Sequence, residues 1–184
     1  MRAPLITSTV SRLLVDLNRS IGHPQLFSVM TRDAPIAVRD EIVKLHYNPY
    51  RLRVEECVNR SVSQRQRVIH ISAHSFTPAL DGKIRHADVG LLYDPERRSE
   101  AALCTTWKLS LADCAPALVV RRNYPYEGKD DGLPSYLRTR FADDAYLGIE
   151  LEINQSIVTA GGQPWKSLRR VLIDSLRLAL DRLL

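Results

Sequence analysis

The sequence predicts an α/β fold, with helices covering a mostly parallel or mixed central sheet in three layers, α/β/α. Short apolar runs alternate along the chain with longer amphipathic segments, the pattern of strands joined by helices. The chain has 184 residues, of which 45% are hydrophobic and 26% charged, values ordinary for one globular domain. We therefore expect a single domain over residues 1–184.

Five apolar runs are predicted to be strands, at residues 11–18, 67–73, 87–94, 116–123 and 148–154. Four segments are predicted to be helices, at residues 35–47, 50–65, 97–113 and 164–183. Pro35 suits a first helical position, and Val38, Ile42 and Leu45 then share a face. A polar, Gly- and Asp-rich loop follows the fourth strand.

The last helix has the strongest pattern. It begins at Pro164, and its apolar residues recur at helical spacing. They are Trp165, Leu168, Leu172, Leu176, Leu180 and Leu183. We expect this helix to pack on the sheet through Leu168, Leu172 and Leu176.

Composition argues against several classes of protein. The net charge of +5 is spread along the chain, without the clustered basic face and interleaved aromatics of a nucleic-acid-binding protein, although a positive field favours a small anionic substrate. Three cysteines without a CxxC motif suggest free thiols rather than a zinc ribbon or a redox pair. No signal-peptide core or membrane-length apolar run occurs, so a cytoplasmic location is expected; the oligomeric state is left open.

Polar residues lie in or just after the predicted strands. In open α/β sheets ligands bind beyond the carboxyl ends of strands, so these side chains could converge on one ligand-binding site. They are Asp16, Asn18, Arg19, His74, Asp94, Asn123, Glu150 and Glu152.

Each candidate has a structural alternative. His74 at a strand end is either a hydrogen-bonded turn residue or a metal ligand. Glu150 and Glu152, two apart on a strand, form either a solvated face or a site with a general base. Asn18 and Arg19 either join a surface salt bridge or bind a substrate carboxylate, for which the arginine fork is suited.

Four segments resemble one family. They are SRLLVDLNR (11–19), HISAHSFTP (70–78), RHADVGLLYDPER (85–97), and NYPYEGKDDG (123–132) together with YLGIELEINQ (146–155). In this order they resemble the N-formylglutamate amidohydrolases, within the phosphorylase/carboxypeptidase-like fold that also includes aspartoacylase-type deacylases. The chain contains no GxSxG, Walker, GxGxxG or HExxH motif that would favour another chemistry.

The resemblance implies zinc-dependent hydrolysis of a linear amide C–N bond in a small anionic N-acyl amino acid such as N-formylglutamate, a reaction of amino-acid metabolism. His74 matches a zinc ligand. Glu152 matches the general base, because Asn154 stands two residues after it as in the family pattern, and Glu150 is the alternative.

The resemblance also implies residues that bind the substrate. Asn18 and Arg19 match the pair that holds the substrate carboxylate. Arg85 is expected to polarise the scissile carbonyl or to bind a second carboxylate, and Tyr126 is expected to contact the substrate.

One departure from the family pattern affects the metal. Family members have an earlier strand whose Glu-His pair supplies two further zinc ligands, and this sequence contains neither a Glu-His pair nor HxxE. His70, His86 and Asp88 are the nearby substitutes, without the family spacing. We therefore expect a domain truncated at its N-terminus relative to the family, with weak zinc binding and impaired activity; the alternative is a non-catalytic carboxylate-binding domain that has lost its metal site.

Overall fold

The structure, a computed structural model, describes residues 3–183 of the chain, which divide into two compact units. The first unit comprises the described part of Met1–Val68 together with Asp131–Tyr146. The second comprises Ile69–Asp130 together with the described part of Leu147–Leu184. The single-domain organisation expected from the length stays a prediction.

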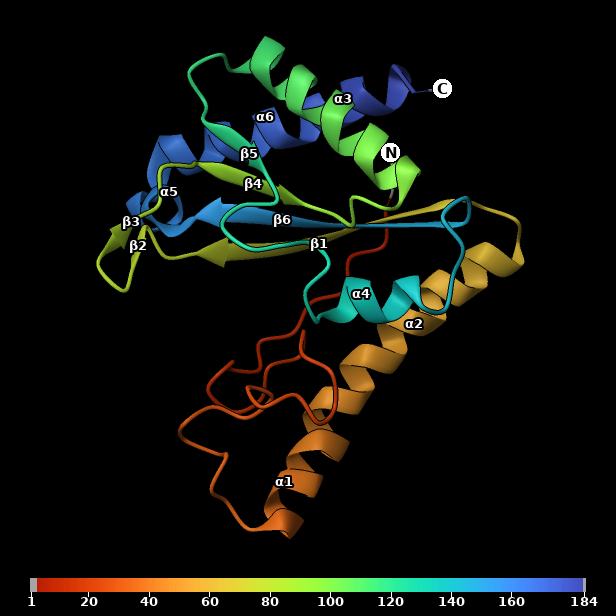
Figure 1. Cartoon of the computed structure of the whole chain (residues 1–184), viewed down its shortest axis with the longest axis vertical. Coiled ribbons are helices and arrows are strands. Elements are labelled where there is room, and N and C mark those ends of the chain that lie inside the picture. Colours follow the sequence, from red (N-terminus) through yellow and green to blue (C-terminus); the bar gives the residue numbers. More distant parts are fainter. Residues whose placement is uncertain (1–2, 184) are drawn as a thin grey trace. The chain divides into compact units, whose positions relative to one another are not determined.

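A four-stranded sheet in the order β1-β6-β4-β5 forms the framework of the second unit (Figure 1). Its strands are β1 (Val68–Phe76), β4 (Val89–Leu92), β5 (Val120–Arg122) and β6 (Tyr146–Asn154). Strand β4 pairs parallel with β5 and antiparallel with β6, so the sheet is mixed. The prediction of an α/β fold with a mixed central sheet flanked by helices is thus confirmed.

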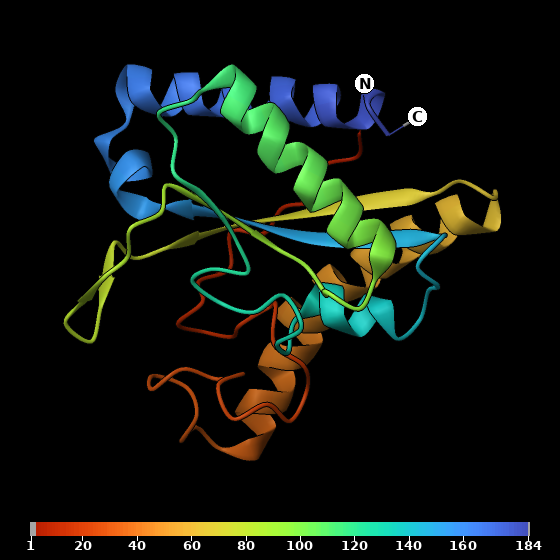
Figure 2. The same cartoon turned by 45° about the horizontal axis from the view of Figure 1, so that its top comes forward.

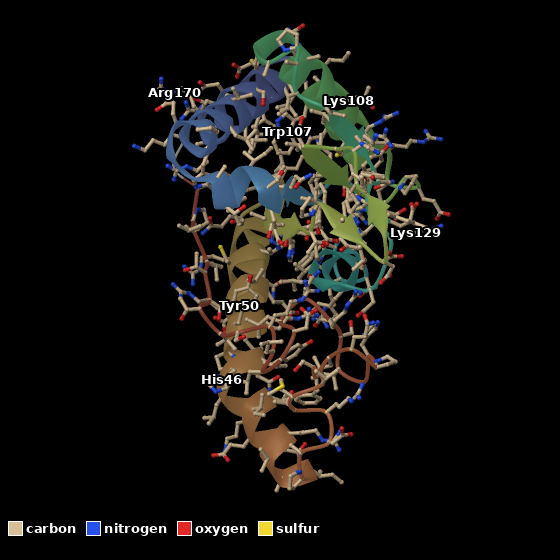
Figure 3. The ribbon with its side chains drawn as sticks, turned by 90° about the vertical axis from the view of Figure 1, so that its left-hand side faces the viewer. His46, Tyr50, Trp107, Lys108, Lys129 and Arg170 are labelled. Atoms are coloured by element: carbon tan, nitrogen blue, oxygen red, sulfur yellow. The ribbon has the colours of Figure 1, made fainter. Side chains whose placement is uncertain are left out.

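Two long helices, α3 (Arg98–Cys114) and α6 (Gly162–Asp181), lie on the same face of this sheet (Figures 1 and 2). The apolar side chains of β6 that face them are Leu147, Ile149, Leu151 and Ile153, all buried in one core with residues of both helices. Trp107 of α3 is also buried there, and its Nε1 donates a hydrogen bond of 3.0 Å to Ser175 Oγ of α6 (Figure 3).

The predicted packing of the last helix is confirmed for Leu168, Leu172 and Leu176, which belong to this core or pack against it. Burying an aliphatic side chain contributes roughly 1.5–3 kcal/mol, so this stripe fixes the helix on the sheet. Leu183 was wrongly placed in the stripe. It lies beyond the helix end at Asp181 and is 46% exposed.

A short hairpin and a short helix follow strands β1 and β6 of the second unit. A hairpin joins β2 (Ala79–Leu80) to β3 (Lys83–Ile84) through Asp81 and Gly82, both at positive φ (49° and 74°). Positive φ at both central residues is the signature of a tight hairpin turn, for which Asp-Gly is a favoured sequence. Helix α5 (Gln155–Ala160) follows β6, and the Asn154 side chain caps it by accepting from the Ser156 amide.

The first unit is helical, with α1 (Ile36–Ile42), the π-helical turn η1 (Val43–Tyr47), α2 (Asn48–Ser63) and α4 (Leu133–Arg138). Ile42 is buried, but Val38 and Leu45 are 44% and 56% exposed, so the face predicted for these three residues is wrong. A π turn contains more residues than an α turn. Tyr47, five residues after Ile42, therefore takes the buried position instead.

Two apolar clusters hold the first unit together. Val54 and Val58 of α2 pack with Leu133 and Leu137 of α4, and Tyr146 completes this group. The second cluster joins the segment before α1 to α1 and η1 through Val15, Leu26, Ile42 and Tyr47. None of the helices within residues 3–183 is long and apolar enough to cross a membrane.

The predicted strand at 11–18 is wrong, because this segment forms turns. The amide of Leu14 donates to the Ser11 carbonyl, and the amide of Asn18 donates to Asp16 Oδ1 at 3.0 Å. Short polar side chains that bond to nearby backbone amides compete with strand pairing. The other predicted strands overlap β1, β4, β5 and β6, and the predicted helices overlap α1 with η1, α2, α3 and α6.

Candidate functional site

One face of the sheet carries polar side chains. Because side chains alternate along a strand, the residues between the apolar ones of β6 point to the opposite face. These include Glu150 and Glu152, which are 7% and 6% exposed, so the alternative of a solvated face does not hold. Two carboxylates buried on one strand are costly unless they are paired or hydrogen-bonded, which marks this face as a candidate site.

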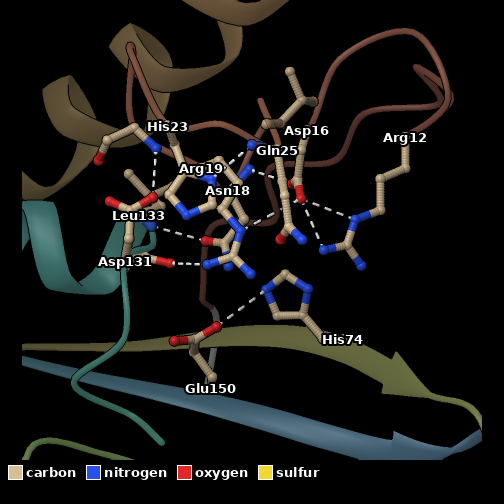
Figure 4. Close-up of polar contacts among 12 residues, drawn as sticks. Arg12, Asp16, Asn18, Arg19, His23, Gln25, His74, Asp131, Leu133 and Glu150 are labelled. Atoms are coloured by element: carbon tan, nitrogen blue, oxygen red, sulfur yellow. Dashed lines mark hydrogen bonds and ion pairs between the residues drawn. The ribbon is translucent and has the colours of Figure 1, made fainter. Parts of the chain in front are cut away.

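His74 lies on the same polar face, on β1. Its Nε2 is 2.9 Å from Ser72 Oγ. The same nitrogen is 3.7 Å from Glu150 Oε2 (Figure 4). Both contacts use the same ring nitrogen. A Ser-His-carboxylate triad uses one nitrogen for each partner, so this arrangement is not such a triad. It is a histidine–carboxylate pair, and the His74 side chain is 27% exposed.

Glu152 lies opposite a glycine of the neighbouring strand. Gly90 of β4 is its register partner, and a Cβ at Gly90 would overlap the backbone carbonyl of Tyr124 and lie 3.2 Å from Glu152 Cβ. Only glycine therefore lets the segment after β5 approach the strand beside Glu152.

The loop that follows β5 is organised by Asn123, which has a φ of 46°. Its Oδ1 accepts from the amides of Tyr93 at 2.9 Å and Gly128 at 3.3 Å. Asp94 has a similar local role, since its Oδ1 accepts from the Glu96 amide. Asn123 and Asp94 were both expected at a ligand-binding site. Their side chains accept hydrogen bonds from backbone amides and so stabilise the loops after β5 and β4.

Arg85 and Tyr126, predicted for different roles, are in direct contact. Arg85 Nη1 donates to Tyr126 Oη at 3.1 Å, and its guanidinium lies 5.0 Å from the Tyr126 ring centre. The same guanidinium is 5.9 Å from the ring of Phe76, which follows His74 by two residues on β1. A cation held by two aromatic rings is a stable and oriented donor.

In the first unit, Asn18 and Arg19 are anchored to the start of α4 (Figure 4). Asn18 Oδ1 accepts from the Leu133 amide at 2.8 Å, and Arg19 Nη1 donates to the Asp131 carbonyl at 2.7 Å. The Ser20 amide donates to Asp131 Oδ2 at 2.9 Å. Burial alone would raise the pKa of Asp131, but hydrogen bonds from Ser20 and nearby positive charges outweigh it and lower this pKa.

Arg19 keeps one buried donor that is not used within the described residues. Its Nε is buried and makes no hydrogen bond there. Arg19 Nε forms an ion pair with Asp16 Oδ2 over a distance of 3.9 Å, which is too long for a hydrogen bond. The same carboxylate oxygen accepts a hydrogen bond of 2.8 Å from Arg12 Nη2. The Arg19 side chain is 24% exposed, so the alternative of an ordinary surface salt bridge does not describe it.

The convergence of Arg19 with His74 and Glu152 in one cleft stays a prediction, because Arg19 belongs to the first unit and the other two to the second. Within the second unit, His74 and Glu150 come together as described. The roles predicted for these side chains are proposals.

The donors expected for zinc can be compared with a catalytic zinc site, which takes three protein ligands. Among residues 3–183, His, Cys, Asp and Glu side chains form no group of three or more that could hold a metal ion. His74 and Glu150 are two neighbouring donors, and His70, His86 and Asp88 complete no such group. The described residues therefore do not fit a complete catalytic zinc site.

Three residues of these arrangements were not anticipated from sequence. Ser72 is two residues before His74 on a strand, so alternation alone could have placed both on one face. Gly90 interrupts an apolar strand, which is a known sign of close backbone approach. Asp131 gave no signal, because its partners Arg19 and Ser20 are more than a hundred residues away in the chain.

The chain is thus an α/β protein with a mixed sheet, one face of which carries two buried carboxylates beside a histidine. Residues 1–159 match the family described as N-formylglutamate amidohydrolase. The chain therefore belongs to the N-formylglutamate amidohydrolase family, as the four sequence segments predicted.

Two solved structures are similar to this chain. A gene product of Agrobacterium tumefaciens has 26% identity and a TM-score of 0.76, over 94% of this chain and 68% of that one. The N-formylglutamate amidohydrolase of Ralstonia eutropha JMP134 has 18% identity and a TM-score of 0.69, over 91% of this chain and 73% of that one, and this likeness shows the fold alone. A search of curated proteins found no match.

Proposed function

We propose that this chain hydrolyses the N-acyl amide bond of a small anionic N-acyl amino acid such as N-formylglutamate. Family membership supports an amidohydrolase activity of this kind. The observation that carries the proposal is the buried pair Glu150 and Glu152 on the polar face of the sheet, with His74 3.7 Å from Glu150. Such a site can supply a base to a water molecule and return its proton to the leaving amine.

Glu152 is proposed as the general base. Its carboxylate takes a proton from water, and the water oxygen attacks the acyl carbon. The C–N bond then breaks, and the amine nitrogen receives the proton from Glu152. For N-formylglutamate the products are formate and glutamate. Glu150, paired with His74, is the alternative base.

Two arginines are proposed to bind the anionic groups. Arg85, held by the rings of Tyr126 and Phe76, would donate to the carbonyl oxygen as negative charge develops on it or would bind a second carboxylate. Arg19, with Asn18 beside it, would bind the substrate carboxylate through charge-assisted hydrogen bonds. Zinc is the cofactor that the resemblance implies, but the donors among the described residues are too few for a catalytic zinc.

A second candidate function is that of a non-catalytic domain that binds a carboxylate. The arrangement around Arg19 favours it, because the hydrogen bonds to Asp131 and Leu133 hold this segment without help from a metal. The two candidates predict the same ligand and differ only in turnover.

The experiment measures binding and turnover together. N-formylglutamate is titrated into the purified chain by calorimetry, and released formate is followed by NMR, with and without added zinc. Arg19→Gln should weaken binding roughly 10- to 100-fold, as expected for the loss of a charged hydrogen-bonding partner. Glu152→Gln should abolish turnover and retain binding, and Glu127→Gln, an exposed carboxylate, is the matched control.

Each outcome decides between the candidates. Turnover that is lost only in Glu152→Gln supports the hydrolase. Binding by the wild-type chain without formate release under either condition supports the carboxylate-binding domain. Absence of binding in the wild-type chain would overturn both.

A further inference from the structure

Arg51 of α2 is a buried charge held between two aromatic rings. It is 8% exposed, and its guanidinium carbon lies 5.3 Å from the Tyr47 ring centre and 4.9 Å from that of Tyr136. Arginine is rarely buried unless its charge is compensated. Contact with the faces of two rings provides such compensation and also fixes the plane of the guanidinium.

This guanidinium is directed at the backbone of the predicted substrate-binding segment. Arg51 Nη1 donates to the Asn18 carbonyl at 3.1 Å and lies 3.5 Å from the Leu17 carbonyl oxygen. Tyr47 Oη donates to the next carbonyl, that of Arg19, at 2.7 Å. Two side chains from η1 and α2 thus hold three consecutive carbonyl groups.

The same segment is held from its other side by the start of α4. Arg19 Nη1 and the Ser20 amide both donate to Asp131, and Asn18 Oδ1 accepts from the Leu133 amide. The backbone of residues 17–20 is therefore fixed on two sides. Arg19 Nε is left buried and makes no hydrogen bond within the described part of the chain. Buried donors in proteins nearly always have an acceptor, and an oxygen of a bound carboxylate would provide one for this nitrogen.

We propose that Arg51 and Tyr47 are positioning residues that set the Arg19 guanidinium for a ligand carboxylate. They contact the backbone of residues 17–19 and act through Arg19. The inference rests on the proposed function, since it assigns a ligand to Arg19. We call Tyr47 of η1 and Arg51 of α2 the clamp. The affinity for the ligand is proposed to depend on this clamp, which the family pattern of residues 11–19 does not indicate.

Two conservative variants test the clamp. Tyr47→Phe removes only the hydroxyl group that donates to the Arg19 carbonyl, and the ring stays in place. Arg51→Lys keeps the positive charge and loses the planar group that stacks on both rings. Arg53→Lys, an exposed position on the same helix, is the control for an Arg-to-Lys change in α2.

The measurements are the dissociation constant of N-formylglutamate, by calorimetry, and the exchange rate of the Ser20 amide, by NMR. Each clamp variant should weaken binding roughly two- to tenfold, the factor that one lost hydrogen bond gives, and should speed Ser20 exchange. Where turnover is measurable, KM should rise while kcat stays constant. Arg53→Lys should match the wild-type chain in every measurement.

Three results would overturn the inference, and two of them leave the proposed function standing. Wild-type binding with an unchanged dissociation constant in both variants refutes the positioning role and leaves the proposed function standing. Faster exchange of the Ser20 amide without weaker ligand binding would show that the clamp only stabilises the segment, and it would also refute the positioning role. Absence of wild-type binding refutes the proposed function itself, and the clamp then has no ligand to position. If Arg51→Lys does not fold, Tyr47→Phe alone decides.

Discussion

Replacing Glu100 should destabilise the second unit more than any change at its surface. This carboxylate is on α3, is fully buried at 0% exposure, and joins the start of the helix to the sheet. Its Oε2 accepts from the Asp94 amide at 3.0 Å, and its Oε1 accepts from the Gly148 amide of β6 at 2.9 Å. Arg97 Nε lies 3.3 Å from the same Oε1.

The cost of Glu100→Ala can be worked from these contacts. A hydrogen bond to a charged group contributes about 1.5–3 kcal/mol, and here two backbone amides and one arginine lose their partner together. Removing one member of a buried ion pair costs about 3–5 kcal/mol. We expect a loss of about 3–5 kcal/mol in the free energy of unfolding, a large part of the roughly 5–15 kcal/mol that a domain has.

Urea unfolding followed by circular dichroism measures this loss. With a slope of about 2 kcal/mol per molar urea, the midpoint should fall by roughly 1.5–2.5 M. Glu100→Gln should give a smaller shift, because its amide oxygen still accepts one of the two backbone hydrogen bonds. Glu96→Ala, an exposed position just before the helix, should leave the midpoint within roughly 0.3 M of the wild-type value. A Glu100→Ala midpoint equal to that of Glu96→Ala would show that the carboxylate does not join α3 to β6 as argued.

Three further predictions concern single residues. Gly90→Ala forces the Tyr124 carbonyl away from β4 and should cost about 1–3 kcal/mol, measured by urea unfolding; an unchanged midpoint would contradict the close approach. Because the pKa of Asp131 is lowered from 3.8 in the folded state, its stabilisation is present above pH 3.8 and is lost as the pH falls through the lower folded value. The stability difference between wild type and Asp131→Asn should therefore shrink between pH 7 and pH 3, and a constant difference would refute this. A thiol reagent should modify exposed Cys114 in the folded chain and reach buried Cys104 only on unfolding, as mass spectrometry of the labelled peptides would show.

The long elements could be predicted from the sequence because their patterns are local. The stripe of Leu168, Leu172 and Leu176 and the apolar alternation of β6 are both visible in a short window of residues. The segment 11–18 has an equally apolar sequence, but Ser11 and Asp16 bond to backbone amides two or three residues away. That competition between side chain and strand pairing is not visible in an apolar count.

For a related reason, only part of the candidate site could be predicted from the sequence. The alternation of side chains along a strand puts Glu150 and Glu152 on one face, but whether that face is exposed to solvent or buried depends on the tertiary fold. Helix α4 was missed because its first amide is bonded by Asn18 from 115 positions earlier in the chain. Arg51 shows the same limit, since a charged residue in a polar helix gives no sign that two tyrosines will enclose it.

The two-sided character of β6 also has a consequence for how the chain avoids misfolding. A slip of one residue against β4 would exchange the two faces of β6. Glu150 and Glu152 would then enter the apolar layer beneath α3 and α6, and Ile149, Leu151 and Ile153 would replace them on the polar face. Both carboxylates are already buried in the native register, so the slip would cost them their polar surroundings, and an uncompensated buried charge costs several kcal/mol. The carboxylates proposed for chemistry thus also reject the wrong alignment of the strand that carries them.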